Sequence, residues 1–335
     1  MIKNNQYYMR LAIKEALKGK ANTYPNPRVG AIVVMDGEII STGYHKRYGA
    51  PHAELMAIKK INNDISGATL FVTLEPCLHY GKTNPCTEII NPKIFSKVVI
   101  GSRDPNKDAA GGMEKLLQKG ISVEGPICEN ECRKINKRFF TYYEKKRPYV
   151  ILKIALTLDG FIAEKNGTSK WITNAKSRKS VHTLRANCDA ILVGNRTIEY
   201  DNPSLTSHGV GKDPKIILFS QNNIDTKTKK VYEHNPIVLN KGENNLDPKK
   251  NVDEILKHLY SKSIQTLLVE GGGITISHFL KADCFDELHV YYAPKLLGKG
   301  LSFFHGKNSL EQNMGLTLKK VEKFDNDIKL TYYKK

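Results

Sequence analysis

Tryptophan and cysteine are scarce in this sequence, and long apolar runs are missing. One Trp and six Cys stand among 335 residues. So low a cysteine content excludes a small secreted domain held by a disulfide framework, and it predicts free thiols in a reducing compartment. No run approaches the roughly 18 to 20 apolar residues of a membrane helix, and the first residues lack the apolar core of a secretory signal. We therefore expect a cytoplasmic protein without a membrane partner.

The length favours two domains rather than one. No internal repeat is present, and both halves alternate strand-like apolar runs with helical periodicity, which is typical of α/β domains with partly parallel sheets. Asp36-Gly37 predicts a tight hairpin, and residues 129–143 predict one charged helix. A basic run closed by Pro148 follows that helix. We place the domains at residues 1–145 and 149–335.

The charge is strongly positive, with 52 Lys and Arg against 34 Asp and Glu, a net charge of +18. Such a field attracts polyphosphates. The lysines are scattered, however, and many stand in polar stretches such as residues 227–230 that are typical of solvated loops. This pattern favours a phosphorylated small substrate and gives no indication of a stable nucleic-acid partner.

The sharpest chemical signal is His52-Ala53-Glu54 followed by Pro76-Cys77 and Pro85-Cys86. Zinc hydrolases commonly hold the metal with three protein ligands and leave one position for water. One imidazole and two thiolates satisfy that number, and Glu54 is a separate carboxylate that can move protons. The sequence therefore predicts one catalytic Zn²⁺ per chain, bound by His52, Cys77 and Cys86, with Glu54 as the catalytic acid and base.

The spacing is compatible with such a site. His52 and Glu54 converge only ahead of a helix N-terminus, because residues two apart do not share a helix face. We expect Cys86 to open a helix, whose dipole stabilises thiolate, and Cys77 to end a strand. Cys128 and Cys132 are four apart without further ligands nearby, and the remaining two cysteines lack a motif, so we expect all four to be packing residues.

The ligand pattern resembles the zinc nucleobase deaminases, whose signature is H-x-E…P-C-x-x-C. Here eight residues, 78–85, separate the cysteines instead of two. The run from Thr73 to Cys86 (TLEPCLHYGKTNPC) resembles the bifunctional riboflavin-biosynthesis deaminase–reductases. The segments PNPRVG (25–30), GYH (43–45) and DPN (104–106) resemble the first half of the same family.

This resemblance implies a cytidine-deaminase-like, layered α/β domain in the first half. It implies zinc-dependent hydrolytic deamination of 2,5-diamino-6-(5-phosphoribosylamino)pyrimidin-4(3H)-one, a phosphorylated pyrimidine. The residues that it assigns to contact with this substrate are Asn26, His45, Lys82, Thr83, Asp104 and Asn106. For each of them a turn or capping role is the structural alternative.

The second half resembles the reductase domain of the family, which implies a dihydrofolate-reductase-like α/β fold. The matching segments are KIALTLDG (153–160), SKWIT (169–173), LR (184–185), DNPSLT (201–206) and VEGGG (269–273). The implied reaction is reduction of the ribosyl side chain to ribityl with NADPH. Without the resemblance the three glycines are a weak signal, since a tight turn explains them equally well and no G-x-G-x-x-G motif is present.

The resemblance also assigns residues to the two ligands of the reductase. Cofactor contacts fall on Ala155, Trp171, Thr197, Asp201, Ser220, Gly272, Gly273, Ile274, Thr275, Ile276, Ser277 and His278. Substrate contacts fall on Lys153, Ser169, Arg185, Leu205, His208 and Glu270. His208 stands where the family usually has Arg, and a neutral imidazole binds phosphate less strongly.

Two other functions compete with this interpretation. A zinc-dependent tRNA or polynucleotide base deaminase with an accessory domain is favoured by the charge and by the His-x-Glu motif. A zinc-stabilised scaffold that binds nucleotides requires a fourth ligand and no Glu54. We expect the bifunctional enzyme, and we expect it to assemble as a homo-oligomer, a dimer or a tetramer.

Overall fold

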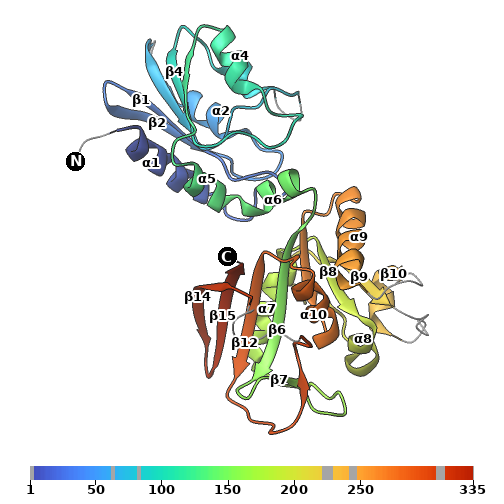
Figure 1. The fold of residues 1–335 in the computed structure, drawn as a ribbon. Coiled ribbons are helices and arrows are strands. Elements are labelled where there is room, and N and C mark those ends of the chain that lie inside the picture. The colour runs from blue at the N-terminus through green and yellow to red at the C-terminus, as the bar shows by residue number, and fades with distance from the viewer. Residues whose placement is uncertain are drawn as a thin grey trace. The chain divides into compact units, whose positions relative to one another are not determined.

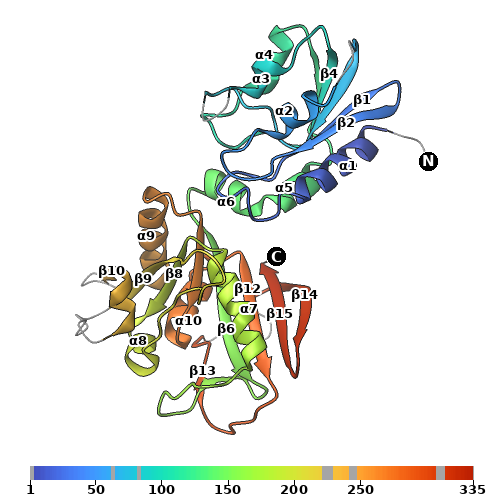
Figure 2. The ribbon, with the colours of Figure 1, turned by 180° about the vertical axis from the view of Figure 1, so that it is seen from behind.

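The computed structural model describes residues 4–61, 65–80, 84–220, 229–240, 247–306 and 314–334. The chain divides into two compact units, Met1–Lys145 and Lys146–Lys335, which can be followed in Figure 1 and, from behind, in Figure 2. Among the described residues no helix is long and apolar enough to cross a membrane.

The first unit is built on a five-stranded sheet in the order β2-β1-β3-β4-β5. Its strands are β1 (Gly30–Met35), β2 (Glu38–Tyr44), β3 (Ala68–Val72), β4 (Phe95–Ile100) and β5 (Ser122–Glu124). The pairs β1–β2 and β1–β3 are antiparallel, and β3–β4 and β4–β5 are parallel. Its helices are α1 (Asn5–Leu17), α2 (Ala53–Ile58), α3 (Cys86–Ile89), α4 (Gly112–Gln118), α5 (Glu129–Ile135) and α6 (Lys137–Lys145).

Both faces of this sheet are buried, so its strands alternate between two cores. In β1, Ala31 and Val33 face a cluster that includes α2 and α4, and Ile32 and Val34 face a second cluster that includes α1 and Cys132 of α5. The helices therefore cover both faces and leave the loops at the strand ends free to carry chemistry.

Of the two element predictions for this unit, the hairpin is confirmed and the long helix is not. Asp36 and Gly37 form the β1–β2 turn with φ of 50° and 78°, as a tight hairpin requires. The single helix expected over 129–143 is wrong, because it divides at Asn136. The Asn136 side chain accepts from the Arg28 N–H at 2.8 Å and donates to the Arg28 carbonyl at 2.8 Å. These two hydrogen bonds to another segment hold Asn136 outside the helical conformation.

The second unit is built on an eight-stranded sheet in the order β10-β9-β8-β11-β6-β12-β15-β14. Its strands are β6 (Tyr149–Thr157), β8 (Ala190–Gly194), β9 (Lys215–Ser220), β10 (Ile237–Asn240), β11 (Thr266–Glu270), β12 (Glu287–Ala293), β14 (Leu316–Phe324) and β15 (Asp327–Lys334). The six strands from β10 to β12 are parallel, and β15 and β14 add an antiparallel hairpin. A small separate sheet pairs β7 (Phe161–Ala163) with β13 (Leu301–Ser302).

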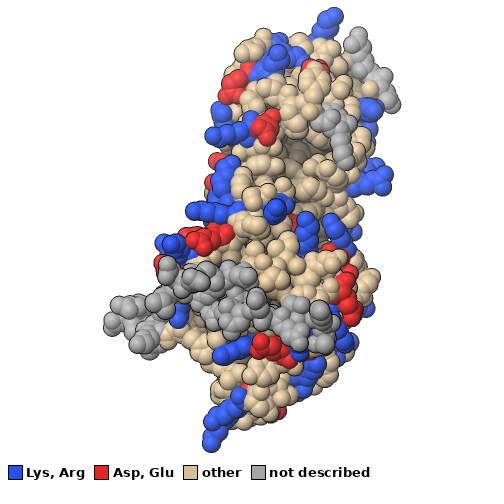
Figure 3. All heavy atoms as spheres, turned by 90° about the vertical axis from the view of Figure 1, so that its right-hand side faces the viewer, with Lys and Arg blue, Asp and Glu red and all other residues tan. Residues whose placement is uncertain are grey.

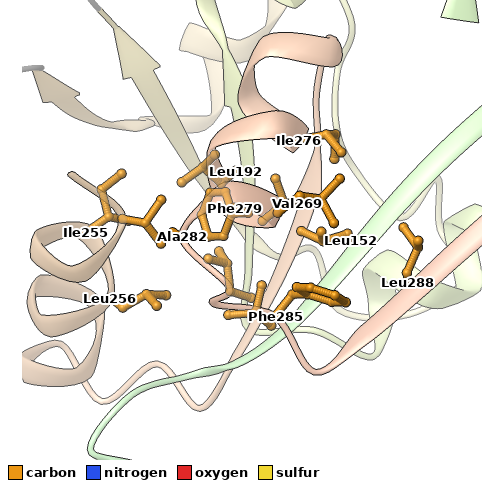
Figure 4. Close-up of a cluster of buried hydrophobic side chains, with 14 of the residues drawn as sticks. Leu152, Leu192, Ile255, Leu256, Val269, Ile276, Phe279, Ala282, Phe285 and Leu288 are labelled. Atoms are coloured by element: carbon orange, nitrogen blue, oxygen red, sulfur yellow. The ribbon is translucent and has the colours of Figure 1, made fainter. Parts of the chain in front are cut away.

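Helices cover this sheet on both faces as well. They are α7 (Ala175–Ala186), α8 (Asn195–Asp201), α9 (Pro248–Ser261), α10 (Gly273–Lys281) and the short 3₁₀ helix η1 (Lys230–His234). Phe279 of α10 and Ile255 of α9 pack on Leu152 and Val269 of the sheet, as Figure 4 shows. The opposite face buries Ile191 with Ile198 of α8 and other apolar residues.

This topology gathers the carboxyl ends of β6, β8, β9 and β11 at one edge of the sheet, because these strands are parallel neighbours. In open α/β sheets, ligands bind outside this edge. Glu270 ends β11 there, and Gly271 to Gly273 lead from it into α10. The fold class expected from the sequence, two α/β domains, is confirmed.

Candidate active sites

Three potential metal ligands of the first unit converge. The Nδ1 atom of His52 lies 3.1 Å from Sγ of Cys86 and 3.5 Å from Sγ of Cys77, and all three ligand atoms lie within 4.8 Å of one another. A tetrahedral zinc with bonds of about 2.0 Å to nitrogen and about 2.3 Å to sulfur places its ligand atoms roughly 3.5 to 3.8 Å apart. The three residues therefore fit one zinc ion with small movements, and only three protein ligands gather among the described residues.

Each ligand is placed by its own element. His52 is the N-cap of α2, with extended backbone angles, and Cys86 is the first residue of α3. Helix α2 passes so close to β2 that a Cβ on Gly43 would lie 2.2 Å from the Ala53 carbonyl oxygen. Glycine at this position thus lets the start of α2 reach the sheet. Cys77 does not end a strand as expected, because β3 stops at Val72 and a loop carries the cysteine.

The electrostatics of the two thiols are compatible with a cation site, and the hydrogen bond with Cys77 also raises the pKa of His52. Hydrogen bonds from Cys86 and His52 lower the pKa of Cys77 to about 4. The pKa of Cys86 is raised well above its usual value by its hydrogen bond with Cys77 and by burial. The buried pair thus holds one negative charge by itself, and a bound divalent cation favours the second thiolate as well. The helix dipole expected at Cys86 contributes little, since α3 has four residues.

Glu54 lies beside this cluster without being part of it. It is in the first turn of α2 and is only 3% exposed. Its Oε2 atom is buried and has no hydrogen-bond partner among the residues that the structure describes. Burial raises the pKa of Glu54, while the nearby His52 acts in the opposite direction. A buried carboxylate with one oxygen left without a partner, next to a candidate metal site, is suited to hold and pass on a proton.

His45 and Asn26 form the wall next to His52. The His45 ring stands edge-on to the His52 ring at 5.6 Å. Its Nδ1 lies 3.1 Å from the Pro51 carbonyl oxygen, and its Nε2 lies 3.2 Å from Nδ2 of Asn26. Burial lowers the pKa of His45, so the ring is neutral, donating through Nδ1 and accepting at Nε2. Asn26 is thereby oriented toward the same region.

A loop from Asp104 to Gly111 closes another side of the site. Glu75 is buried and accepts from the backbone N–H groups of Asp104, Gly111 and Met113 at 3.0 to 3.1 Å. Asn106 donates its backbone N–H to Asp104 Oδ1 at 2.8 Å. Ala109 of the loop packs against the two cysteines. Burial raises the pKa of Asp104 to about 7.

Sequence reasoning assigned no role to Glu75 or to Lys119. The Lys119 ammonium group donates at 2.7 Å to the carbonyl oxygens of Thr87 and Ile90, and so holds the short helix that begins at Cys86. For Glu75, the one available signal in the sequence was an acidic residue directly before Pro76-Cys77. No sequence signal marks the second, because its partners are backbone atoms.

In the second unit, three charged residues meet at the sheet. Arg185 of α7 donates from Nε and Nη2 to the two carboxylate oxygens of Glu270, at 2.8 and 3.1 Å. Lys153 of β6 is paired with Glu270 in the strand register, and its Nζ lies 3.5 Å from Oε2. Burial by itself raises the pKa of Glu270, but Arg185 and Lys153 lower it to about 2. Glu270 is therefore ionised and orients both cations.

A second set of contacts surrounds the start of α10. Gly272 donates its N–H to Oγ1 of Thr197 at 3.1 Å, and among the described residues a Cβ at Gly272 would meet only this atom, at 3.8 Å. The backbone of Gly272 therefore leaves room for a ligand, and the free N–H groups of a helix N-terminus bind phosphate oxygens. These residues, at the carboxyl edge of the parallel strands, fit a dinucleotide. Nearby, Ser169 donates from Oγ to Asp201 at 2.9 Å.

Gly273 and Ser277 attach the segment after β13 to α10. A Cβ at Gly273 would lie 2.3 Å from the Ser302 carbonyl oxygen. Ser277 Oγ accepts from the His305 N–H at 2.8 Å and donates to the Phe303 carbonyl at 3.3 Å. Gly273 and Ser277 therefore form the seam between helix and loop.

The other assigned residues are placed as follows. The side chains of Leu205 and Ile276 are buried in the cores of the unit, so only their backbone is available to a ligand. Trp171 is 62% exposed and carries the Arg178 guanidinium over its ring at 4.4 Å. Thr275, which touches Gly271, lies with Ala155, Ile274 and His278 at or near the same edge. Lys82, Thr83 and the side chain of Ser220 lie outside the described residues.

The remaining cysteines are reduced, and Cys132 and Cys188 are buried among apolar residues. Cys128 and Cys132 do not share a helix face, because Cys128 is the N-cap of α5 with a φ of 56°. Neither belongs to a metal-binding group within the described part of the chain.

Family models match both units. Residues 2–102 match the cytidine and deoxycytidylate deaminase zinc-binding region, and residues 148–330 match the RibD C-terminal domain. The riboflavin biosynthesis protein RibD of Aquifex aeolicus is 43% identical over 341 residues and covers 96% of each chain. The protein of the same name from Escherichia coli is 34% identical, over 97% of this chain and 98% of its own.

Solved structures agree over the full length. A Thermotoga maritima protein described as a diaminohydroxyphosphoribosylaminopyrimidine deaminase/5-amino-6-(5-phosphoribosylamino)uracil reductase is similar with a TM-score of 0.82 and 39% identity, covering 98% of both chains. RibD of Acinetobacter baumannii is similar with a TM-score of 0.84 and 33% identity, covering 99% of both chains.

Fold, sites and comparisons together define an enzyme that combines a zinc-binding deaminase domain with a reductase domain. The chain belongs to the RibD family, the bifunctional deaminase–reductases of riboflavin biosynthesis. Its cofactors are Zn²⁺ and NADPH. These findings favour the bifunctional enzyme over a polynucleotide deaminase. In the view of Figure 3, Lys and Arg side chains are dispersed among other residues rather than joined in one basic stripe.

Proposed function

We propose that the first unit deaminates 2,5-diamino-6-(5-phosphoribosylamino)pyrimidin-4(3H)-one to 5-amino-6-(5-phosphoribosylamino)uracil. The second unit then reduces the ribosyl side chain of this product to ribityl with NADPH. The observation that carries the first assignment is the convergence of one imidazole nitrogen and two sulfurs within 4.8 Å beside the buried Glu54. The description of the Thermotoga maritima relative supports both substrates.

In the deaminase, His52, Cys77 and Cys86 hold the zinc ion. Zinc, when bound, supplies a Lewis acid that lowers the pKa of its water to ~7. Water adds to the amine-bearing ring carbon and ammonia leaves, so one water proton must move to the neighbouring ring nitrogen and the other to the departing amino group. Glu54 carries these protons, since its Oε2 has no other partner among the described residues and burial raises its pKa.

The walls of the site orient the substrate. Neutral His45 fixes Asn26 through the 3.2 Å contact between their side chains. The remaining amide hydrogen and carbonyl oxygen of Asn26 can pair with the edge of a pyrimidine. Asp104 and Asn106 stand on the loop that packs against the cysteines, where they can contact the ring or the ribose. Lys82 and Thr83 complete the proposed set from outside the described residues.

In the reductase, the residues at the carboxyl edge of the sheet divide between two ligands. When bound, NADPH would supply hydride to C1 of the sugar after the C1–O4 bond has opened to a C1=N imine, and a proton from solvent would go to the nitrogen. Gly272 and Gly273, with Thr197, Asp201, Trp171 and the first turn of α10, hold the cofactor next to the strand ends. Lys153, Ser169, Arg185, Leu205, His208 and Glu270 form the substrate side. Glu270 keeps Lys153 and Arg185 in place through its two ion pairs.

Two of the three proposed zinc ligands are cysteine thiolates, and such thiols persist in a reducing compartment, which supports a cytoplasmic location. We also propose a homo-oligomer, a dimer or a tetramer. Strand β14 is an edge of the large sheet, nine residues long, and exposes Leu318 and Val321 by 49% and 58%. Long edges of this kind pair readily with another chain, and light scattering of the purified protein measures the resulting mass.

Glu54→Gln tests the deaminase assignment. The variant keeps the size of the side chain and the three ligands, so we expect bound zinc to remain near one ion per chain. Ammonia release from the diaminopyrimidine should fall by roughly 10²- to 10⁴-fold, the usual contribution of a general acid and base. NADPH oxidation with the preformed aminouracil should stay within about twofold of wild type.

The measurements are metal analysis, an ammonia assay and absorbance at 340 nm. Removal of zinc with a chelator is the matched control, because it should abolish ammonia release and spare NADPH oxidation. Loss of both activities in Glu54→Gln with zinc retained would show that the two reactions do not use separate sites.

A further inference from the structure

The substrate side of the reductase contains two imidazoles in direct contact. The rings of His182 and His208 are stacked, with centroids 4.2 Å apart and planes inclined by 28°. His182 belongs to α7 and is partly buried, whereas His208 is exposed on the segment after α8. The Nε2 atom of His208 also lies 3.4 Å from Oγ of Ser204. Sequence reasoning named His208 alone and gave no role to His182.

The segment that carries His208 is fixed at both ends. Arg185 donates from Nη1 to the Thr206 carbonyl oxygen at 3.1 Å. Ser207 is buried; its backbone N–H donates to Asp213 Oδ1 at 2.7 Å, and its hydroxyl lies within hydrogen-bond distance of Asp213 Oδ1, at 2.7 Å, and of the Gly211 carbonyl oxygen, at 2.8 Å. His208 itself has a φ of 51°, a region that non-glycine residues seldom adopt. The imidazole stack is therefore held in place by the loop and does not result from a freely moving surface side chain.

The stack extends a basic face of α7. Arg178, His182 and Arg185 are separated by four and three positions, so they share one face of the helix. Arg178 lies over the Trp171 ring and donates from Nη1 to the Thr173 carbonyl at 2.6 Å. Arg185 stands beside Glu270 and Lys153. This face of α7 thus carries three basic residues that stand next to the reductase site.

The charges next to Glu270 can compensate only part of the negative charge of a bound phosphate group. Around Glu270, Arg185 and Lys153 contribute two positive charges and the ionised Glu270 one negative charge, a sum of +1 for these three residues, while Arg178 on the same face of α7 is engaged with the Trp171 ring and the Thr173 carbonyl. A phosphomonoester carries about two negative charges near pH 7. Further positive charge must come from neighbouring groups, and the stacked imidazoles are the titratable groups in position to supply it.

We propose that His182 and His208 jointly bind the phosphomonoester of the reductase substrate and that this binding takes up protons onto the stack. The proposal rests on the proposed function and specifies its substrate side. It accounts for the replacement of the usual Arg by His208, since a second imidazole can share the charge with it.

Proton uptake follows from the surroundings of the pair. The pKa of His182 is lowered by burial, by His208, by Arg185 and by Arg178. Glu270 acts in the opposite direction. On the loop side, the charged group near His208 is Asp213, which also interacts with His234. Without an anion, two imidazolium rings at this distance repel each other. A bound dianion removes this repulsion and stabilises the charged form of both rings, so affinity decreases as pH rises.

The phosphate of NADPH is the other source of the same chemistry. The cofactor residues Gly272 and Thr197 are joined to each other at the start of α10, whereas the stack is joined through Arg185 to Glu270 and Lys153. We therefore assign the stack to the pyrimidine substrate, and separate KM values for substrate and NADPH distinguish the two sources.

The test follows NADPH oxidation by the full-length, zinc-loaded protein with the aminouracil phosphate between pH 7 and 8.5, where the phosphate is a dianion throughout. In the wild type, the substrate KM should rise about tenfold over this range through loss of the linked proton, with little change in the KM of NADPH. In His208→Arg the rise should shrink to about twofold. His182→Asn should raise the substrate KM roughly fivefold at pH 7 and flatten its pH dependence, with kcat less affected.

His258→Asn, on α9 and remote from these residues in the fold, is the control and should keep the wild-type profile. Calorimetry with inorganic phosphate at pH 7 in two buffers of different ionisation enthalpy gives the protons bound, and it does not depend on reductase activity. The wild type should take up protons that His208→Arg does not. Equal proton uptake in both proteins, an unchanged pH profile in His208→Arg, or an effect confined to the KM of NADPH would overturn the proposal. Absence of NADPH oxidation together with normal proton-linked phosphate binding would instead contradict the proposed function alone.

Discussion

Arg185 and Glu270 form a two-point ion pair between α7 and the end of β11, with Nε–Oε1 and Nη2–Oε2 distances of 2.8 and 3.1 Å. Both side chains are largely buried, at 12% and 10% exposure. The loss of one partner from a buried pair leaves an uncompensated charge, which is more costly than the net value of the pair itself. This relationship therefore links the geometry of the reductase site to the stability of the second unit.

Glu270→Gln should destabilise the second unit by on the order of 3 kcal/mol at pH 7. The folded state lowers the pKa of Glu270 from 4.5 to about 2. An acid with a lowered pKa stabilises the fold above its unfolded pKa, and this stabilisation is lost as pH falls from about 4.5 through 2. The difference between variant and wild type should therefore shrink below pH 4. Trp171 is the single tryptophan, so its fluorescence during denaturant unfolding reports on this unit, and Glu254→Gln is the exposed control.

Asp104 should make stability depend on pH with the opposite sign to Glu270. Burial raises its pKa from 3.8 to about 7, so the folded state binds the proton more tightly than the unfolded chain. Stability of the first unit should thus fall as pH rises from about 4 through 7, by up to roughly 3 kcal/mol. Asp104→Asn removes this term, so the variant should match wild type near pH 4.5 and exceed it at pH 8. Hydrogen exchange of the β4 and α4 amides in zinc-loaded protein measures the change, and a pH slope that survives in the variant would refute it.

Two adjacent glycines at the start of α10 should respond differently to alanine. A Cβ at Gly273 would overlap the Ser302 carbonyl oxygen at 2.3 Å, so Gly273→Ala should destabilise the second unit by about 2 kcal/mol. In the part of the chain that the structure describes, the added methyl of Gly272→Ala meets only Thr197 Oγ1, at 3.8 Å, so the variant should leave stability nearly unchanged. If phosphate groups of NADPH approach Gly272, this variant should raise the KM of NADPH about tenfold. Equal stability losses in the two variants would contradict the packing argument.

Local patterns in the sequence were enough to predict most of the fold. The Asp36-Gly37 turn is a short-range feature, and it is present as expected. The break at Asn136 was not predictable, because it depends on hydrogen bonds to Arg28, more than one hundred positions away. The hairpin of β14 and β15 was not predicted either, because the exposed positions of β14 give this strand no clear apolar alternation.

The residues of the candidate sites also fall into two groups, those that the sequence indicates and those that only the tertiary structure brings together. His52, Glu54, Cys77 and Cys86 were recognisable because zinc chemistry restricts both the residue types and their order. The supporting contacts of Glu75 and Lys119, and the stacking of His182 on His208, join distant segments through backbone atoms or ring faces. Such contacts depend on the tertiary structure and leave no local pattern in the sequence.

Two of the three candidate metal ligands, Cys77 and Cys86, stand 25 and 34 residues after His52 in the sequence. An ion bound by all three cross-links α2, the loop after β3 and α3, and it closes chain loops that the unfolded protein would otherwise sample freely. Zinc supply would then govern how much of this enzyme resists proteolysis in the cell, as well as how fast it releases ammonia.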